Sequence, residues 1–350
     1  MVRFGICSCG DSRASPRLSG RAKLDGFLAT TGRLSHPPDP FSAKKLSAVR
    51  RGFEDASAIL PGMPVKRPKK PRVAIVGAGN LAGALAVSLR AAGYSIDLII
   101  SRSRADSVPR GRRLAREVGA MAVAGAHARI QSEVVWFCVP DRAIAGAAQS
   151  LLEAADWKGK VALHSSGALT SDVLAVLRRQ GAAVASVHPL MTFVRGSRPP
   201  FEEVPFAIEG DKKAVRAARA MVGALGARAF AIRKQQKGPY HAWGMFVSPL
   251  LTALLAASEA VAAAAGVSRK AARHRMLPIL KQTLENYARL GAPGSFSGPI
   301  ARGDTDTIAK HLIVLRSLPG VREVYVALAR SALRDLPSKH GTQLRRILKG

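Results

Sequence analysis

The chain has 350 residues, 47% of them apolar, and is long enough for two domains that each bury a core. It carries 54 Lys and Arg against 23 Asp and Glu, a formal net charge of +31, with +10 in residues 1–72 and +21 in the rest. A positive charge distributed along the whole chain could attract nucleic acid or favour a phosphorylated small ligand. It could also reflect an amino-acid composition biased toward Arg and Ala. The sequence has no basic-plus-aromatic motif of a nucleic-acid module, so we expect no specific nucleic-acid partner.

Residues 1–70 are rich in Arg, Ser, Pro and Gly and show no sustained periodicity. We predict a disordered basic N-terminal extension. Three alternatives stay open: an over-extended gene model with Met63 as the natural start, a basic arm that binds a partner, and an organelle transit peptide.

The three cysteines do not make a disulfide framework. Cys7 and Cys9 are too close together to bridge comfortably or to form half of a zinc site, and Cys138 lies in an apolar run. The N-terminus also lacks the continuous apolar core of a secretory signal. We therefore expect no metal and a cytoplasmic location.

From Arg72 onward, short apolar runs alternate with helical stretches. Strands are expected at residues 73–76, 96–100, 134–139, 161–163 and 183–187, and a helix at Leu81–Ala92. Residues 206–208 and 229–232 flank one further helix, Lys212–Leu225, and complete the domain. This alternation predicts an α/β fold, a Rossmann-type doubly wound parallel sheet with helices on both faces.

After Lys234 the sequence predicts only helices, at residues 240–265, 271–290, 306–315 and 321–336. The expected organisation is an extension (1–70), a nucleotide-binding domain (71–233), a mostly α-helical C-terminal domain for substrate and dimerisation (234–338) and a basic tail (339–350). Residues 242–258 are uncharged, but this stretch is short for a membrane span and contains Pro249. We expect a helix buried in a domain or dimer, and no membrane.

The segment Gly77-Ala78-Gly79-Asn80-Leu81-Ala82 matches the pattern G-x-G-x-x-G/A of dinucleotide-binding turns. Gly77 permits the turn from strand to helix, Gly79 lets the backbone approach a diphosphate, and Ala82 keeps helix and strand close. The helix N-terminus, near Asn80 and Leu81, offers amide groups to the phosphates. The motif follows a strand and opens a helix, which is the context that supports it.

The end of the second strand distinguishes NADP(H) from NAD(H). An NAD site usually has Asp or Glu there, but this chain has Ser101-Arg102-Ser103-Arg104, and Asp97 comes too early. Arginine presents a planar fork of donors to a 2′-phosphate, so we expect NADP(H) rather than NAD(H). Val139 and Pro140, at the end of a later strand, complete the expected cofactor set, and Asp141 is expected to cap the following helix.

Candidate catalytic groups follow two more strands. His164 and Ser166 end one strand, and His188, with Thr192 shortly after it, ends the next. Their imidazole and hydroxyl groups could move the proton that accompanies hydride transfer. Alternatively, either histidine could have a purely structural role.

Three further candidates, Lys237, Tyr240 and His241, share one face at the start of the first C-terminal helix. We interpret His188, Lys237, His241 and Ser166 as catalytic. The expected substrate contacts are His164, Thr192, Tyr240, Asn286 and Arg302. Asp304 is expected to cap a helix, and His311 could serve either structure or function.

Taken together, these motifs resemble a bacterial family that joins a Rossmann-like domain to a helical domain of unknown function. The resemblance covers residues 73–333 and includes Gly298-Pro299-Ile300-Ala301-Arg302-Gly303-Asp304. The family resembles a branch of the 6-phosphogluconate dehydrogenase-like superfamily, with pyrroline-5-carboxylate reductase, ketopantoate reductase and prephenate dehydrogenase among its relatives. The resemblance implies a cofactor at the first domain, a substrate between the domains and a homodimer built on the long helices.

Two residue-level resemblances are informative. In β-hydroxyacid dehydrogenases and ketopantoate reductases a Lys starts the helical domain and an Asn follows four residues later; Lys237 matches, but His241 stands in place of the Asn. His188-Pro189-Leu190 is similar to the His-Pro-Met of prephenate dehydrogenases, which supports His188 as the acid or base. The expectation is an NADP(H)-dependent oxidoreductase acting on a small carboxylate-bearing carbonyl, imine or alcohol. The alternatives are an NADP(H)-binding redox sensor or scaffold without turnover, and a nucleic-acid-binding protein.

Overall fold

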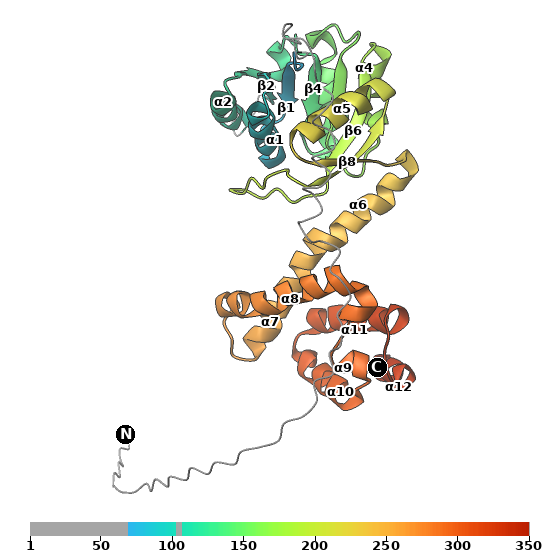
Figure 1. Ribbon diagram of the computed structural model, residues 1–350. Coiled ribbons are helices and arrows are strands. Elements are labelled where there is room, and N and C mark those ends of the chain that lie inside the picture. Colours follow the sequence, from blue (N-terminus) through green and yellow to red (C-terminus); the bar gives the residue numbers. More distant parts are fainter. Residues whose placement is uncertain (1–68, 103–106, 350) are drawn as a thin grey trace, which may run out of the picture. The chain divides into compact units, whose positions relative to one another are not determined.

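The computed structural model describes residues 69–102 and 107–349 (Figure 1). The extension expected for residues 1–70 therefore lies outside the described residues, except for Lys69 and Lys70. The described chain begins with an α/β domain and continues into a helical region, as the sequence predicts.

The α/β domain is built on one eight-stranded sheet with the strand order β3-β2-β1-β4-β5-β6-β7-β8. The strands are β1 (Val73–Val76), β2 (Ile96–Ser101), β3 (Met121–Ala124), β4 (Val134–Phe137), β5 (Val161–His164), β6 (Ala183–Pro189), β7 (Pro205–Gly210) and β8 (Arg228–Ala231). Every residue of β1, β4 and β5 is buried. These strands read as continuous apolar runs because helices cover both faces of the sheet.

Two helical layers enclose the sheet. One apolar core joins it to α1 (Asn80–Ala91), α2 (Ser107–Val118) and α5 (Lys212–Ala224). A second core, on the other face, joins it to α3 (Asp141–Ser150) and α4 (Ala175–Arg179). Neighbouring strands β1 and β4 lie where the chain changes direction along the sheet. In such sheets ligands bind at this point, beyond the carboxyl ends of the strands.

The sheet differs from the expected one in two ways. The neighbours β6 and β7 are antiparallel, and β8 runs parallel to β7, so the sheet is mixed. The connection from Leu190 to Val204 therefore stays at the carboxyl edge of β6 instead of crossing the sheet. Strand β3, which the sequence did not locate, is short and half exposed, so it lacks a strong apolar signal.

The helical region contains α6 (Lys237–Met245), α7 (Leu251–Ala264), α8 (Arg269–Ser295), α9 (Pro299–Arg302), α10 (Thr305–Val314), α11 (Pro319–Asp335) and α12 (Gly341–Ile347). A π-helical turn at Phe246–Leu250 joins α6 to α7 and contains Pro249, which has no amide hydrogen to donate. By length and composition, the stretch Lys234–Ala264 is apolar enough to cross a membrane. Residues 339–350, expected only as a basic tail, contain α12, whose Leu344 is fully buried.

Candidate active site

The glycine-rich turn after β1 has the geometry that a dinucleotide needs. Gly77 has a φ of +117°, and a β-carbon on it would lie 2.4 Å from the carbonyl oxygen of Cys138, so only glycine fits. At Gly79, in contrast, a β-carbon would meet nothing within 4 Å. Gly79 precedes α1 without a side-chain cap from any described residue, so the first amide groups of α1 are available to an anion.

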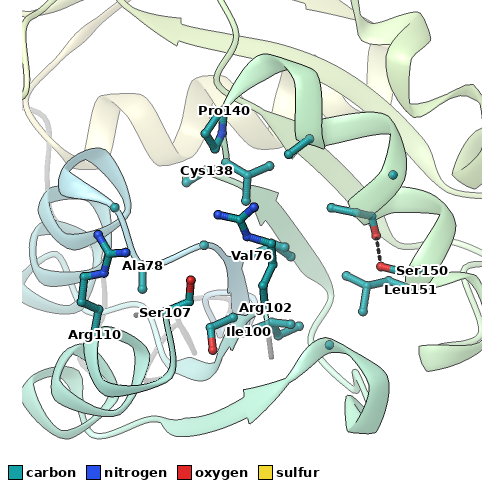
Figure 2. Close-up of a pocket in the computed structure, with 18 of the residues that line it drawn as sticks. Val76, Ala78, Ile100, Arg102, Ser107, Arg110, Cys138, Pro140, Ser150 and Leu151 are labelled. Carbon is teal, nitrogen blue, oxygen red and sulfur yellow. Dashed lines mark hydrogen bonds between the residues drawn. The ribbon is translucent and has the colours of Figure 1, made fainter. Parts of the chain in front are cut away.

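A cavity of about 540 Å³ opens beside this turn, between the carboxyl ends of β1, β2 and β4 (Figure 2). Six residues expected from the sequence line it: Gly77, Gly79, Ser101, Arg102, Val139 and Pro140. Figure 2 shows the Arg102 side chain extending into the cavity, with Ser107 and Arg110 of α2 on the neighbouring wall. Ser107 and Arg110 were not predicted from the sequence, although an arginine in the first helix turn after this strand is a recognisable signal.

The charge of the cavity suits a phosphate. Among the described residues that line it, Arg102 and Arg110 are basic and none is acidic. Asp97 accepts a hydrogen bond from Ser132 (3.0 Å) and lies near Arg72, early in β2, so it cannot take the place of the usual acidic residue at the strand end. These residues fit a nicotinamide dinucleotide.

Two described residues of the expected cofactor set, Asn80 and Leu81, do not line this cavity. The Asn80 amide donates to the carbonyl oxygen of Phe193 (3.1 Å), and Leu81 packs against the apolar core. Ser103 lies outside the described residues.

A second group of polar side chains gathers at the ends of β5 and β6 and the start of α6. His188 Nδ1 and the Tyr240 hydroxyl are 2.8 Å apart, and the rings of His188 and His241 are 6.4 Å apart. Gly167 closes this group, because a β-carbon there would lie 2.9 Å from His188 Nε2 and 2.8 Å from His241 Cδ2. We call His188, Tyr240, His241 and Gly167 the histidine cluster.

Lys237, the first residue of α6, forms buried hydrogen bonds with residues at the ends of the sheet strands. Its side chain is 1% exposed, and its ammonium group donates to the Ser166 carbonyl oxygen (2.9 Å) and to the Ser186 hydroxyl. Burial lowers the pKa of Lys237 to about 8, although the charges of Glu209 and Asp141 oppose this shift. Lys237 thus fixes the start of α6 against the strand ends, and its nitrogen faces protein atoms.

Ser166 and His164 shape the turn after β5. The Ser166 hydroxyl donates to an Asp141 carboxylate oxygen (2.8 Å) and accepts from the Leu169 amide (2.9 Å). His164 is fully buried; its Nδ1 accepts from the Ser166 amide and its Nε2 lies 3.1 Å from the Thr170 carbonyl oxygen. Burial, followed by the charge of Lys237, lowers the pKa of His164 to about 3. The ring is therefore neutral, and both of its nitrogens are used by the turn.

Asp141 links the two sites. It was expected to cap α3, but it is the first residue of that helix and accepts from Ser166. Its neighbour Pro140 lines the cofactor cavity, while Ser166 precedes Gly167 of the histidine cluster. The cavity and the cluster therefore lie at adjacent strand ends of one sheet.

The remaining residues that were expected to contact the substrate are not part of the histidine cluster. Thr192 is exposed in the β6–β7 connection, Asn286 accepts from Gln282 within α8 (3.1 Å), and Arg302 ends α9. None of the described hydrogen bonds joins these three residues to the histidine cluster. Asp304 caps α10 through the Thr307 amide (3.1 Å), as expected, and His311 bonds to the Tyr325 hydroxyl (3.1 Å).

Two family descriptions match this chain over its described domains. A Rossmann-like domain matches residues 61–189, and a domain of unknown function (DUF2520) matches residues 204–332. The chain is a Rossmann-like protein with a DUF2520 domain. None of the curated proteins matches it.

Solved structures share this two-domain fold. A candidate NADP oxidoreductase from Bacteroides fragilis is 23% identical, with a TM-score of 0.65 over 75% of this chain and 98% of that one. A protein from Thermotoga maritima is 24% identical, with a TM-score of 0.58 over 79% and 98%. An imine reductase from a Pseudomonas species is 20% identical, with a TM-score of 0.52 over 75% and 93%. At these identities the likeness concerns the fold. The DUF2520 match, which starts at residue 204, begins at the last strands of the sheet.

Proposed function

We propose that this protein is an NADP(H)-dependent oxidoreductase that exchanges hydride with a small carboxylate-bearing carbonyl, imine or alcohol. The observation that carries the proposal is the open turn at Gly79 beside a cavity whose charged side chains are Arg102 and Arg110. The 2′-phosphate would lie against these two guanidinium groups and the Ser107 hydroxyl, and the diphosphate against the first amides of α1. When bound, the nicotinamide supplies or accepts the hydride.

The histidine cluster would move the accompanying proton. Burial, followed by the charges of Lys237 and His241, lowers the pKa of His188 to about 4, so this ring is neutral at pH 7. Burial raises the pKa of the Tyr240 hydroxyl to about 12, so it keeps its proton. In the direction of oxidation, neutral His188 accepts the proton of the substrate's hydroxyl or amine and releases it to solvent. In reduction, His188 takes up a proton from solvent and gives it to the substrate's oxygen or nitrogen. Tyr240 orients the ring through Nδ1.

Lys237 would act as a positioning residue. Its buried ammonium group holds α6, and with it Tyr240 and His241, against the end of β5. Its charge also disfavours a positive charge on His188, so it favours an anionic group nearby. The positive charge of Lys237 is therefore our reason for proposing that the substrate carries a carboxylate.

The proposal is tested by titrating the protein with NADPH and NADH and following nicotinamide fluorescence. We expect NADPH to bind well below millimolar concentration, and Arg102→Ala to weaken NADPH at least tenfold while changing NADH little, because only NADPH carries the 2′-phosphate. If neither dinucleotide binds below millimolar concentration, the proposal is wrong.

His188→Gln separates an enzyme from a binding protein. In an oxidoreductase this variant keeps its NADPH affinity but loses turnover of the substrate found by incubating the protein with NADPH and a metabolite mixture. A redox sensor or scaffold would keep its cellular function in the variant, because the histidine would then be dispensable.

We infer further that the enzyme works as a cytoplasmic homodimer. Large apolar side chains of α6, α7, α8 and the π-helical turn between α6 and α7 are exposed in the single chain, including Phe246 (69%) in that turn and Ile279 (68%) in α8. Such surfaces are characteristic of obligate interfaces.

A further inference from the structure

A second cavity lies on the other side of the glycine-rich turn. It has a volume of about 990 Å³ and shares Ala78, Gly79 and Arg110 with the cofactor cavity. Its other basic residues are Arg113 of α2 and Arg195 and Arg198 of the β6–β7 connection. We call this cavity the arginine cleft. Figure 2 shows Arg110 beside Ala78, where the two cavities meet.

The β6–β7 connection is fixed beside the turn. The Asn80 amide donates to the Phe193 carbonyl oxygen (3.1 Å), which ties the connection to the first residue of α1. The Phe193 ring packs against Phe201 with a centroid distance of 5.6 Å, and Phe201 is 2% exposed in the core. Arg195, two residues after Phe193, is therefore held near the N-terminus of α1.

The arginine cleft has an excess of positive charge. Four arginines line it, and no described lining residue is acidic. Glu117 lies nearby and pairs with Arg198 through both carboxylate oxygens, and this pairing lowers the pKa of Glu117. The charge of Arg113 lowers the pKa of Glu117 as well, so this one carboxylate offsets part of the positive charge of the cleft. Bringing like charges together costs free energy, which a bound anion can recover.

The position of the arginine cleft indicates which anion it would bind. The uncapped N-terminus of α1 forms part of the wall that the two cavities share, and this is where a dinucleotide places its diphosphate. A 2′-phosphate on Arg102 would occupy the other cavity. The two anionic groups of one cofactor therefore match two basic regions separated by the glycine-rich turn.

We propose that the arginine cleft binds the diphosphate of the dinucleotide, with Arg195 of the β6–β7 connection and Arg113 of α2 as its charged contacts. The inference rests on the proposed function. It adds a second wall to the phosphate site. This wall is supplied by a connection outside the glycine motif, whose contact residue Phe193 lies 113 residues after Asn80. Arg102 then selects NADPH over NADH, whereas Arg195 strengthens both.

Affinities of Arg195→Ala and Arg113→Ala for NADPH and NADH test this assignment. The diphosphate is common to both dinucleotides, so we expect each variant to weaken NADPH and NADH by the same factor, about tenfold. Arg102→Ala weakens NADPH alone. Arg216→Ala, on the exposed face of α5, removes the same charge elsewhere and should leave both affinities within twofold of the parent.

A competition experiment supplies a second readout. Inorganic pyrophosphate should displace NADH from the parent protein. With NADH held at the same multiple of its Kd for each protein, about tenfold more pyrophosphate should be needed in Arg195→Ala. Arg113 and Arg195 are both exposed, so these variants should keep the parent's melting temperature.

The outcomes separate the two proposals. If the parent binds NADPH but Arg195→Ala and Arg113→Ala leave both affinities within twofold, the diphosphate assignment is wrong and the proposed function stands. If either variant weakens NADPH alone, the cleft contacts the 2′-phosphate and the assignment is equally wrong. If the parent binds neither dinucleotide, both proposals fail.

Discussion

At the scale of single residues, Gly167 controls the spacing of the two histidines in the cluster. A β-carbon at this position would lie 2.9 Å from His188 Nε2 and 2.8 Å from His241 Cδ2, too close for either ring to stay in place. We expect Gly167→Ala to fold, because the rings can rotate away, and to lower kcat by about 10- to 100-fold, because a small misplacement of a catalytic group is costly.

The measurement is a comparison of turnover and NADPH affinity in the parent and the variant. The affinity should be unchanged, since Gly167 does not line the cofactor cavity. Gly223→Ala is the matched control, because a β-carbon there would meet nothing within 4 Å. Unchanged kcat in Gly167→Ala would remove the histidine cluster from the mechanism.

Two histidines that look alike in the sequence have different surroundings in the structure. His164 is the last residue of β5 and His188 is the last but one of β6, and the motif pattern treats them equally. The structure uses both nitrogens of His164 in a local turn, whereas His188 pairs with Tyr240, which lies 52 residues further along the chain. Motif position predicts which strand end a residue occupies, but the role of its side chain depends on contacts from distant segments.

At the scale of secondary-structure elements, the C-terminal helix α12 belongs to the core of the helical region. Leu344 is fully buried and Leu348 is 2% exposed, and they pack with Ile308 and Leu312 of α10 and with Leu333 of α11. We expect Leu344→Ala to lower the free energy of unfolding by about 2–5 kcal/mol, the usual cost of removing a buried leucine.

Urea denaturation followed by circular dichroism measures this loss, with Arg346→Ala on the exposed side of α12 as the control. A change below about 0.5 kcal/mol in Leu344→Ala would mean that the helix is peripheral. The sequence suggested only a basic tail here, because four of its twelve residues are Arg or Lys and the two leucines that the helix buries give only a short apolar pattern.

The sheet shows a similar division between what could and could not be predicted. Mostly apolar runs identified β1, β2, β4, β5 and β6, because strands covered on both faces contain few polar residues. The direction of β7 could not be predicted, since an apolar run has the same composition in either orientation. That direction decides where the β6–β7 connection lies, and the arginine cleft was missed for this reason.

At the scale of the whole molecule, the helical region has more exposed apolar surface than a single chain needs. A groove of about 570 Å³ is lined mainly by apolar residues of α7, α10 and α11, among them Leu254, Val314 and Leu328. Residues Lys281, Glu285 and Arg289 lie among the exposed apolar residues of α8, and charged side chains are costly in lipid. Lipid is therefore a poor cover for α8, and the proposed second copy of the chain would cover its exposed apolar residues.

The homodimer is tested by light scattering coupled to size-exclusion chromatography. We expect the parent protein to elute in detergent-free buffer with twice the chain mass of 37.0 kDa. Leu254→Arg should give the mass of one chain, because it places a charge in the apolar groove. Met121→Arg changes a large exposed apolar residue of β3 and should leave the dimer intact. A parent protein with the mass of one chain would contradict the dimer. If that protein also floated with liposomes, a membrane would be favoured instead, because lipid would then cover the apolar surfaces of α6 and α7.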